Sequence, residues 1–140
     1  MQIKTISCNE TLEIRQRVLW PEKTVQECLV DGDEHACHFG VFLNVGLVGV
    51  ASTFDTNGVV RLRKFAVDTE YQGKGLGSAL FNHALEHARH DGARVFWCDA
   101  RETAVEFYKK YGMRVEGEQF YKSEIPYRRM SIELNSTNGV

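Results

Sequence analysis

A glycine-rich stretch from Gln72 to Ser78 carries the clearest chemical signal in the sequence. An apolar run typical of a strand ends at Val67, glycines follow at positions 73, 75 and 77, and a helical pattern begins among them. The first N–H groups of a helix have no partner inside the helix, and the helix dipole favours negative charge at that end. Because glycines lack a Cβ atom, a phosphate can approach those amides closely. The spacing therefore predicts a phosphate-binding turn.

Two common phosphate-binding patterns do not fit this turn. A dinucleotide-binding G-x-G-x-x-G motif starting at Gly73 needs a glycine where Ser78 stands, and one starting at Gly75 needs a glycine at Leu80. A P-loop needs Gly-Lys followed by Ser or Thr, and the sequence contains no such tripeptide. The pattern that fits is Gln-x-x-Gly-x-Gly, which begins at Gln72.

This pattern resembles the pyrophosphate-binding motif of the GNAT superfamily of N-acetyltransferases, in which Arg or Gln is followed by x-x-Gly-x-Gly or x-x-Gly-x-Ala. A second block, 104–113, is similar to the A-x-x-F-Y-x-K-x-G-F segment of that family, and the two blocks stand in the family's order. The segments 17–21 and 125–130 are similar to a small bacterial single-domain branch. The chain is therefore identified as a member of this superfamily.

The resemblance implies that acetyl-coenzyme A (acetyl-CoA) is the co-substrate and that a primary amine of a small molecule attacks it directly in a ternary complex. Backbone amides of the turn would hold the pyrophosphate, with the charge of Lys74 beside them. Main-chain groups at the end of the preceding strand would contact the pantetheine arm and polarise the acetyl carbonyl. The cofactor-binding residues so implied are Phe65, Ala66, Val67, Gln72, Gly73, Lys74, Gly75, Leu76, Gly77, Ser78, Arg101 and Tyr108.

Tyr108 matches the family's general acid. A free thiol has a pKa of about 8.5 and a phenol of about 10, so this tyrosine can protonate the departing thiolate without being ionised at neutral pH. One alternative is that Tyr108 simply packs on the sheet; weaker candidates for the same role are Tyr111, Tyr121 and Tyr127. The attacking amine, with a pKa of about 10.4, also needs a base. Many relatives place a glutamate early in the fourth strand; this chain has none there, and Asp99 is the candidate base instead.

Other residues stay open for these roles. Glu102 and Glu118 are further candidate bases, and Cys98 is a less favoured acetyl-carrying nucleophile. Arg101 stands where many relatives carry a cofactor-facing asparagine, and positive charge gathers nearby over 61–64. Such charge would suit a phosphate or an acceptor that carries a carboxylate beside its amine. A charged edge facing solvent is the alternative.

His83 and His87 complete the pattern His-x-x-Glu-His, the signature of inverted zinc peptidases. Two histidines four residues apart share a helix face and could bind zinc. The same helix buries an apolar stripe, however, and both histidines lie on the flank of that stripe. We therefore predict no metal.

Hydrophobic periodicity predicts an α/β (α+β) fold in the order β-α-α-β-β-β-α-β-α-β-β. The resemblance adds a mixed, mainly antiparallel sheet with a splay between the fourth and fifth strands. A capping box at Ser7 and Glu10 begins the first helix, which Pro21 ends. Strands are expected at 3–6, 38–43, 47–54, 59–67, 94–98, 113–120 and 127–134, and helices up to residue 20 and at 22–29, 75–90 and 103–111.

Composition limits the remaining function classes. The 140 residues favour one domain, expected over 1–135 with a flexible tail at 136–140. With 43% hydrophobic and 26% charged residues the chain is not intrinsically disordered, and no apolar run approaches a membrane helix. A net charge of -2 disfavours general nucleic-acid binding. Four cysteines without a C-x-x-C pair favour reduced thiols and a cytoplasmic location.

Three alternatives stay open for the function itself. The chain could acetylate a protein amino terminus or lysine, use a longer acyl group, or bind coenzyme A as a sensor without catalysis. The acceptor-side loops, about 20–38 and 120–129, contain no pattern that names the acceptor. Relatives are often homodimers, which leaves a homodimer open here.

Overall fold

The computed structural model describes residues 1–134, which fall into two compact units. The first unit comprises residues 1–54 and 62–87, and the second comprises residues 55–61 and 88–134. Within residues 1–134 the strands form a seven-stranded sheet in the order β1-β2-β3-β4-β5-β7-β6, in which β4 and β5 are the parallel pair. The mixed, mainly antiparallel fold predicted from the sequence is confirmed. The predicted tail at 136–140 lies outside the described residues.

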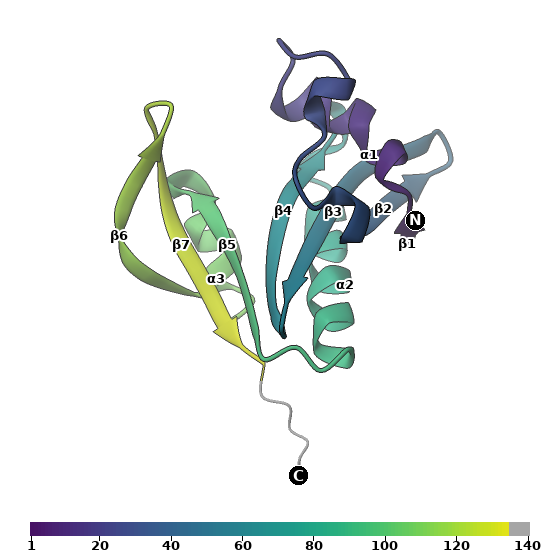
Figure 1. The fold of residues 1–140 in the computed structure, drawn as a ribbon. Coiled ribbons are helices and arrows are strands. Elements are labelled where there is room, and N and C mark those ends of the chain that lie inside the picture. The colour runs from purple at the N-terminus through teal and green to yellow at the C-terminus, as the bar shows by residue number, and fades with distance from the viewer. Residues whose placement is uncertain (135–140) are drawn as a thin grey trace. The chain divides into compact units, whose positions relative to one another are not determined.

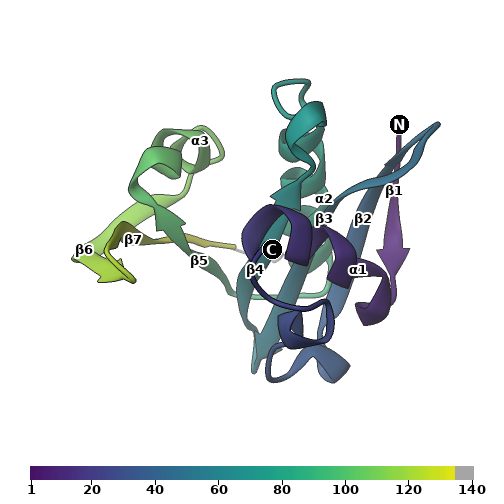
Figure 2. The same ribbon diagram turned by 90° about the horizontal axis from the view of Figure 1, so that it is seen from above.

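The first unit packs helices on both faces of its strands (Figures 1 and 2). His38 and Phe39 show the two faces: the Phe39 ring contacts two histidines of α2, whereas His38 bonds to Asp33, which Arg15 directly after α1 also contacts. Neighbouring strand residues point to opposite faces, so α1 and α2 cover different sides. Its elements are β1 (Gln2–Ile6), α1 (Cys8–Ile14), the π-helical turn η1 (Arg15–Leu19), the 3-10 turns η2 (Gln26–Cys28), η3 (Asp33–His35) and η4 (Thr69–Tyr71), β2 (Cys37–Leu43), β3 (Gly46–Thr56), β4 (Val59–Val67) and α2 (Leu76–His90), of which β3, β4 and α2 extend past its bounds.

The predicted capping box is confirmed at the start of α1. Glu10 N donates to Ser7 Oγ at 3.2 Å, and Ser7 N donates to Glu10 Oε1 at 2.7 Å. The predicted helix reaches Trp20, but the α-helix ends at Ile14 and the chain continues as a π-helical turn, in which Trp20 N donates to Arg15 O at 3.1 Å. One extra residue in the turn widens it, and such turns are frequent at functional sites.

The helix predicted over 22–29 is wrong, because only the 3-10 turn η2 forms there. The backbone groups that would continue a helix are bound by side chains instead. Arg15 Nη1 donates to Cys28 O at 3.1 Å, and Val30 N donates to an Asp33 carboxylate oxygen at 2.8 Å. Local periodicity could not show these two partners, because both lie outside the predicted helix.

The second unit contains a β5–β7–β6 sheet with α3 against one face (Figure 1). The strand β4 joins it in parallel, with Val59 to Arg61 opposite Val95 to Trp97. The helix predicted over 103–111 is shorter than expected: a 3-10 turn precedes it, and Gly112, with a φ of 89°, follows its end. The unit's own elements are β5 (Val95–Arg101), η5 (Glu102–Ala104), α3 (Val105–Lys109), β6 (Arg114–Lys122) and β7 (Ile125–Glu133).

The last two strands are longer at the hairpin than predicted. Their turn is Ser123-Glu124, and both residues have a positive φ, of 49° and 70°. Two-residue hairpin loops favour this backbone, but Asn-Gly or Asp-Gly is its usual sequence. The turn was therefore not visible in the residue types. In the part of the chain that the structure describes, no helix has the length and apolar character needed to cross a membrane.

Candidate functional site

The glycine-rich turn joins β4 to α2 as the sequence predicted. It begins at Asp68, whose N–H donates to Val48 O at 2.8 Å, and passes through the 3-10 turn η4. Gly73 and Gly75 have φ values of 80° and 82°, in the left-handed region that favours glycine. A Cβ atom at either position would meet no atom within 4 Å. These two glycines are therefore explained by backbone conformation rather than by crowding from the protein.

Six consecutive backbone N–H groups, from Gly73 to Ser78, donate to no acceptor within residues 1–134. The next one, Ala79 N, donates to Gly75 O at 3.1 Å and so starts the hydrogen bonding of the 15-residue α2. The turn thus presents a row of donors at the positive end of a helix dipole, and its residues are mostly exposed. This arrangement fits a pyrophosphate, the group that the sequence motif predicts.

Gln72 holds the end of β4 rather than pointing its amide at the row of donors. Its Nε2 donates to Val67 O at 2.9 Å, across the base of the turn. Ala66 and Val67 are buried, and the Phe65 ring lies 6.3 Å from the ring of Phe81. The side chains at the end of β4 are therefore packing residues, and the predicted main-chain contact of this segment with the pantetheine arm stays a prediction.

An ion pair that the sequence did not reveal joins η1 to the start of the turn. Arg17 donates from Nε to Asp68 Oδ1 at 2.8 Å and from Nη2 to Oδ2 at 2.9 Å. The hydrogen bond that Arg17 donates to Asp68 raises the pKa of Arg17, against a smaller opposing effect of burial. Because the two partners are 51 positions apart in the sequence, no local pattern could pair them.

The remaining basic residues of β4 in this unit contact aromatic rings. Arg63 lies over Phe54 with its guanidinium carbon 5.3 Å from the ring centroid. Lys64 Nζ lies 3.9 Å from the centroid of Trp20, and Lys64 itself has a φ of 56°. Part of the positive charge predicted over 61–64 is thus engaged in cation–π contacts.

In the second unit, Tyr108 and Cys98 form a buried pair. Both side chains are less than one-tenth exposed, and the tyrosine hydroxyl hydrogen-bonds the thiol. Burial, together with the nearby Cys98, raises the pKa of Tyr108. Burial likewise raises the pKa of Cys98 to about 12, with a further contribution from Asp99. Both groups are therefore protonated at neutral pH, so the Tyr108 hydroxyl carries a proton, but its raised pKa makes it a weaker acid than a free phenol. The protonated thiol does not suit Cys98 as a nucleophile.

Asp99 lies on the opposite face of β5 from Cys98 and contacts three cations. Its Oδ2 accepts from Arg61 at 3.1 Å and from Lys122 at 3.2 Å, and its Oδ1 accepts from Arg129 at 3.1 Å. The carboxylate is only 5% exposed, whereas the cations are 29%, 47% and 50% exposed in the same order. We call these four residues the Asp99 cluster. Lys122 and Arg129 were missing from the sequence-based site, since only strand register brings them to Asp99.

The Asp99 cluster does not favour the role of Asp99 as a base. Burial acts to raise its pKa, but hydrogen bonds from Arg129 and Lys122 and their charges outweigh burial and leave the pKa below its ordinary value. A base for an amine works best with a pKa near the operating pH. The assignment of Asp99 as the base stays a prediction that these contacts weaken.

The other predicted carboxylates and Arg101 have simpler surroundings. Glu102 accepts from Gln119 Nε2 and Arg128 Nε, each at 3.0 Å, and these two bonds lower its pKa. Glu118 is exposed on β6, and Arg101 is exposed at the end of β5. The predicted contact of Arg101 with coenzyme A stays a prediction.

The two histidines of the apparent zinc signature pack against an aromatic ring. His83 and His87 lie edge-on to Phe39, with centroid distances of 5.3 and 5.0 Å. Phe39 is fully buried, so both imidazoles cover the core at the flank of α2. This is the position that the helical pattern predicted.

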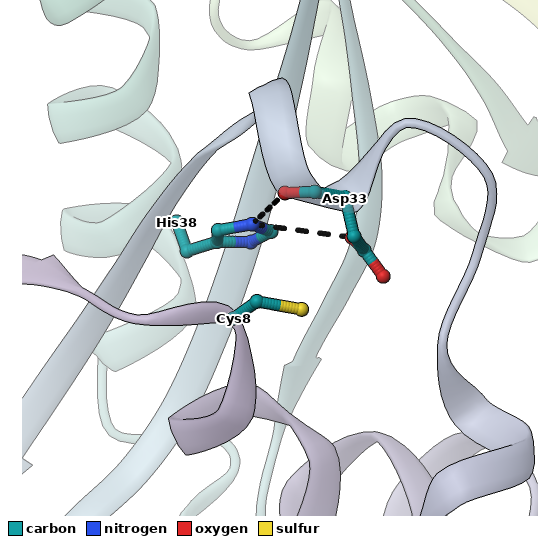
Figure 3. A group of neighbouring side chains, drawn as sticks. All are labelled: Cys8, Asp33 and His38. Atoms are coloured by element: carbon teal, nitrogen blue, oxygen red, sulfur yellow. Dashed lines mark hydrogen bonds and ion pairs between the residues drawn. The ribbon is translucent and has the colours of Figure 1, made fainter.

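A different group, Cys8, Asp33 and His38, brings three metal-binding atom types within 4.8 Å of one another (Figure 3). Hydrogen bonds already use the imidazole nitrogens and the carboxylate oxygens of this group. His38 Nε2 donates to Asp33 O at 2.9 Å, and His38 Nδ1 lies 2.7 Å from Ser52 Oγ, from which it accepts in that tautomer. Both carboxylate oxygens of Asp33 accept from Arg15, at 2.8 and 2.9 Å. The group is thus explained as part of a hydrogen-bonded network in the core.

Comparisons with known proteins agree on one family. A model of the acetyltransferase (GNAT) domain matches residues 13–134. The chain is 33% identical to the uncharacterized N-acetyltransferase YitI of Bacillus subtilis, over 86% of this chain and 87% of that one. It is 27% identical to the spermine/spermidine N(1)-acetyltransferase of the same species, over 81% and 84%. A Bacillus subtilis acetyltransferase solved in complex with CoA has a similar fold, with a TM-score of 0.74 at 20% identity over 96% and 99% of the two chains.

Proposed function

Because the chain belongs to the GNAT family and is an N-acetyltransferase of that type, we propose that it transfers an acetyl group from acetyl-CoA to a primary amine of a small molecule, by direct attack in a ternary complex. The observation that carries this proposal is the row of six N–H groups from Gly73 to Ser78 that have no acceptor in the described part of the chain. A structural neighbour solved with CoA supports the choice of co-substrate.

In this proposal the amides of the turn bind the pyrophosphate, and Lys74 adds charge beside them. Gly73 and Gly75 permit the left-handed backbone on which the turn depends. Main-chain groups of Phe65 to Val67 contact the pantetheine arm and polarise the acetyl carbonyl, and Arg101 contacts the same co-substrate. The neutral amine attacks the thioester carbon, and a C–N bond forms as the C–S bond breaks. The coenzyme A thiolate leaves and takes a proton from Tyr108, and the proton that the amine nitrogen loses passes to water.

Calorimetry with CoA tests the turn directly. A Gly75→Ala variant places a side chain on a residue with a φ of 82° and should weaken CoA binding by about tenfold or more, since it displaces several amides at once. Gly92→Ala is the matched control, because Gly92 has a φ of 85° and equally open surroundings at the far end of α2. Equal affinity in the two variants would refute the assignment of the turn.

Tyr108 is the proposed general acid. Its protonated, buried hydroxyl provides the proton that the thiolate needs. A Tyr108→Phe variant should lower kcat by about 10²-fold while CoA affinity stays within about threefold. Tyr111→Phe, three residues along the chain, is the control. A normal kcat in the Tyr108→Phe variant would leave Tyr108 with a packing role only.

Thiol release from acetyl-CoA with a panel of amines separates this function from its alternatives. Turnover with small amines supports the proposal. Turnover only with peptides would move the acceptor to a protein amino terminus or lysine. CoA binding without thiol release for any amine or peptide would favour a sensor.

A further inference from the structure

We infer that the Asp99 cluster binds a carboxylate of the acceptor, so that the preferred acceptors are amines that also carry a carboxylate. This inference rests on the proposed function and names its substrate class. It assigns Asp99 to positioning Arg61, Lys122 and Arg129 rather than to removing a proton.

The first argument is charge. Three cations surround one carboxylate. A further acid, Glu116, lies opposite Arg129 in the β6–β7 register and accepts a hydrogen bond from Ser131. Even with Glu116 counted, three positive groups face two negative ones. Asp99 by itself cannot neutralise the cluster, so an added anion is favoured there.

The second argument is unused hydrogen-bonding capacity. Arg129 contacts Asp99 through Nε only, so both of its terminal NH₂ groups have no acceptor among residues 1–134. Lys122 donates one bond to Asp99, and its ammonium has three donors in all. These two side chains are about half exposed, so a ligand can reach them. Guanidinium and ammonium groups together offer the donors that a carboxylate accepts.

The third argument is that the cluster is held in place before any ligand arrives. The Trp97 ring receives guanidiniums from both neighbouring strands, Arg61 of β4 at 4.6 Å and Arg129 of β7 at 4.2 Å from its centroid. Lys122 Nζ lies 4.9 Å from the centroid of Tyr127. Asp99 and these rings fix three flexible side chains, which reduces the entropy lost on binding.

The face itself is accessible within the second unit. Residues alternate along β5, so Asp99 points away from Cys98 and from α3, whose Tyr108 contacts Cys98. The cluster therefore lies on the sheet face that α3 leaves uncovered. The same charges would repel a polyamine, which distinguishes the expected acceptor from that named for the spermine/spermidine relative.

A binding experiment tests the site without catalysis. Trp20 and Trp97 are the two tryptophans of the chain, so a Trp20→Phe variant reports Trp97 fluorescence alone. Addition of 4-aminobutyrate should change that emission saturably, and butylamine, the same amine chain without the carboxylate, should not. Arg129→Gln in this background should weaken the response by about tenfold or more. Lys110→Gln, which removes an exposed cation at the end of α3, should leave it unchanged.

The kinetic arm compares the same two amines with acetyl-CoA. The ratio of kcat/KM for 4-aminobutyrate over butylamine should be about tenfold or more and should fall toward one in Arg129→Gln, whereas Arg129→Lys should retain most of it. Turnover of both amines at equal rates would overturn the inference and leave the proposed function standing. Arg129-dependent binding without any turnover would contradict the proposed function and still support the carboxylate site.

Discussion

Each unit of the protein holds an aspartate whose side chain is at most 5% exposed and is paired with arginine, and the two arrangements differ in their balance of charge. In the first unit Asp33 pairs with a single arginine, Arg15, through two hydrogen bonds, and the side chains are 4% and 0% exposed. In the second unit Asp99 is almost as buried but meets three cations that water still reaches. The charges of Asp33 and Arg15 therefore balance, whereas the Asp99 cluster carries more positive than negative charge.

This difference separates charged groups that only stabilise the fold from charged groups that can also bind a ligand. Arg15 donates hydrogen bonds from Nη1 and Nη2 to Asp33, Ser52 and Cys28 O. Among residues 1–134, its Nε is the one nitrogen of this guanidinium without a partner, and it is buried from solvent. The exposed donors of the Asp99 cluster are in excess of what its carboxylate can accept. The burial of the aspartate side chain does not distinguish the two sites, because it is nearly the same in both.

Removal of the carboxylate charge from the balanced pair should have the largest effect on stability. Asp33→Asn leaves the Arg15 guanidinium buried without a counter-charge, and breaking such a pair costs about 3–5 kcal/mol. Urea unfolding measures the loss. Asp31→Asn, which changes an exposed aspartate two residues away, should have almost no effect.

Loss of the hydroxyl that links Arg15 to His38 should have a smaller effect. Ser52 Oγ accepts from Arg15 Nη2 at 3.1 Å and lies 2.7 Å from His38 Nδ1. Ser52→Ala leaves that imidazole nitrogen buried without a partner, at a cost of about 1–3 kcal/mol in the free energy of unfolding. An unchanged unfolding midpoint would show that the network does not extend beyond the ion pair.

Acid should weaken the balanced pair in a defined pH window. Burial acts to raise the pKa of Asp33, but bonds from Arg15 and Val30 and the charge of Arg15 lower it overall. The folded pKa thus lies below the unfolded value of about 3.9, so the stability it provides is present above pH 4 and is lost as pH falls through the folded pKa. Unfolding free energies measured from pH 6 to pH 2 should fall less steeply in Asp33→Asn than in the wild type.

The smallest stability effect is expected in the Asp99 cluster. Asp99→Asn leaves three cations that water solvates, so the cost should stay below about 1 kcal/mol. The same urea measurement compares it with Asp33→Asn. A loss as large as that of Asp33→Asn would remove the distinction between the two sites and, with it, the argument that the cluster has donors to spare.

The sequence predicted best those features of the site that depend on local backbone conformation. The turn from Gln72 to Ser78 was predicted at the correct strand-to-helix junction, because positive φ values and unbonded amides depend on neighbouring residues alone. The capping box at Ser7 was found for the same reason. Periodicity also gave the order of the strands along the chain, and resemblance to a family gave the mainly antiparallel sheet.

Contacts distant in sequence were not predictable in this way. Arg129 and Lys122 reach Asp99 only because β5, β7 and β6 lie side by side in one register. The partners of Arg15 lie 13 to 37 residues away, and they end the segment that looked helical. Charge and hydropathy specify which residues are polar, whereas pairing among polar residues is set by the completed sheet.

Two consecutive residues of strand β5 make different kinds of contact on opposite faces of the sheet. Cys98, which contacts Tyr108, and Asp99, which contacts the cations, are consecutive residues that point to opposite sides. A deletion or insertion of one residue ahead of them would exchange the two sides, and would place the aspartate against the tyrosine and the thiol among the arginines. Natural variation in this segment should therefore proceed through exchange of side chains at constant length, never through a change in the number of residues.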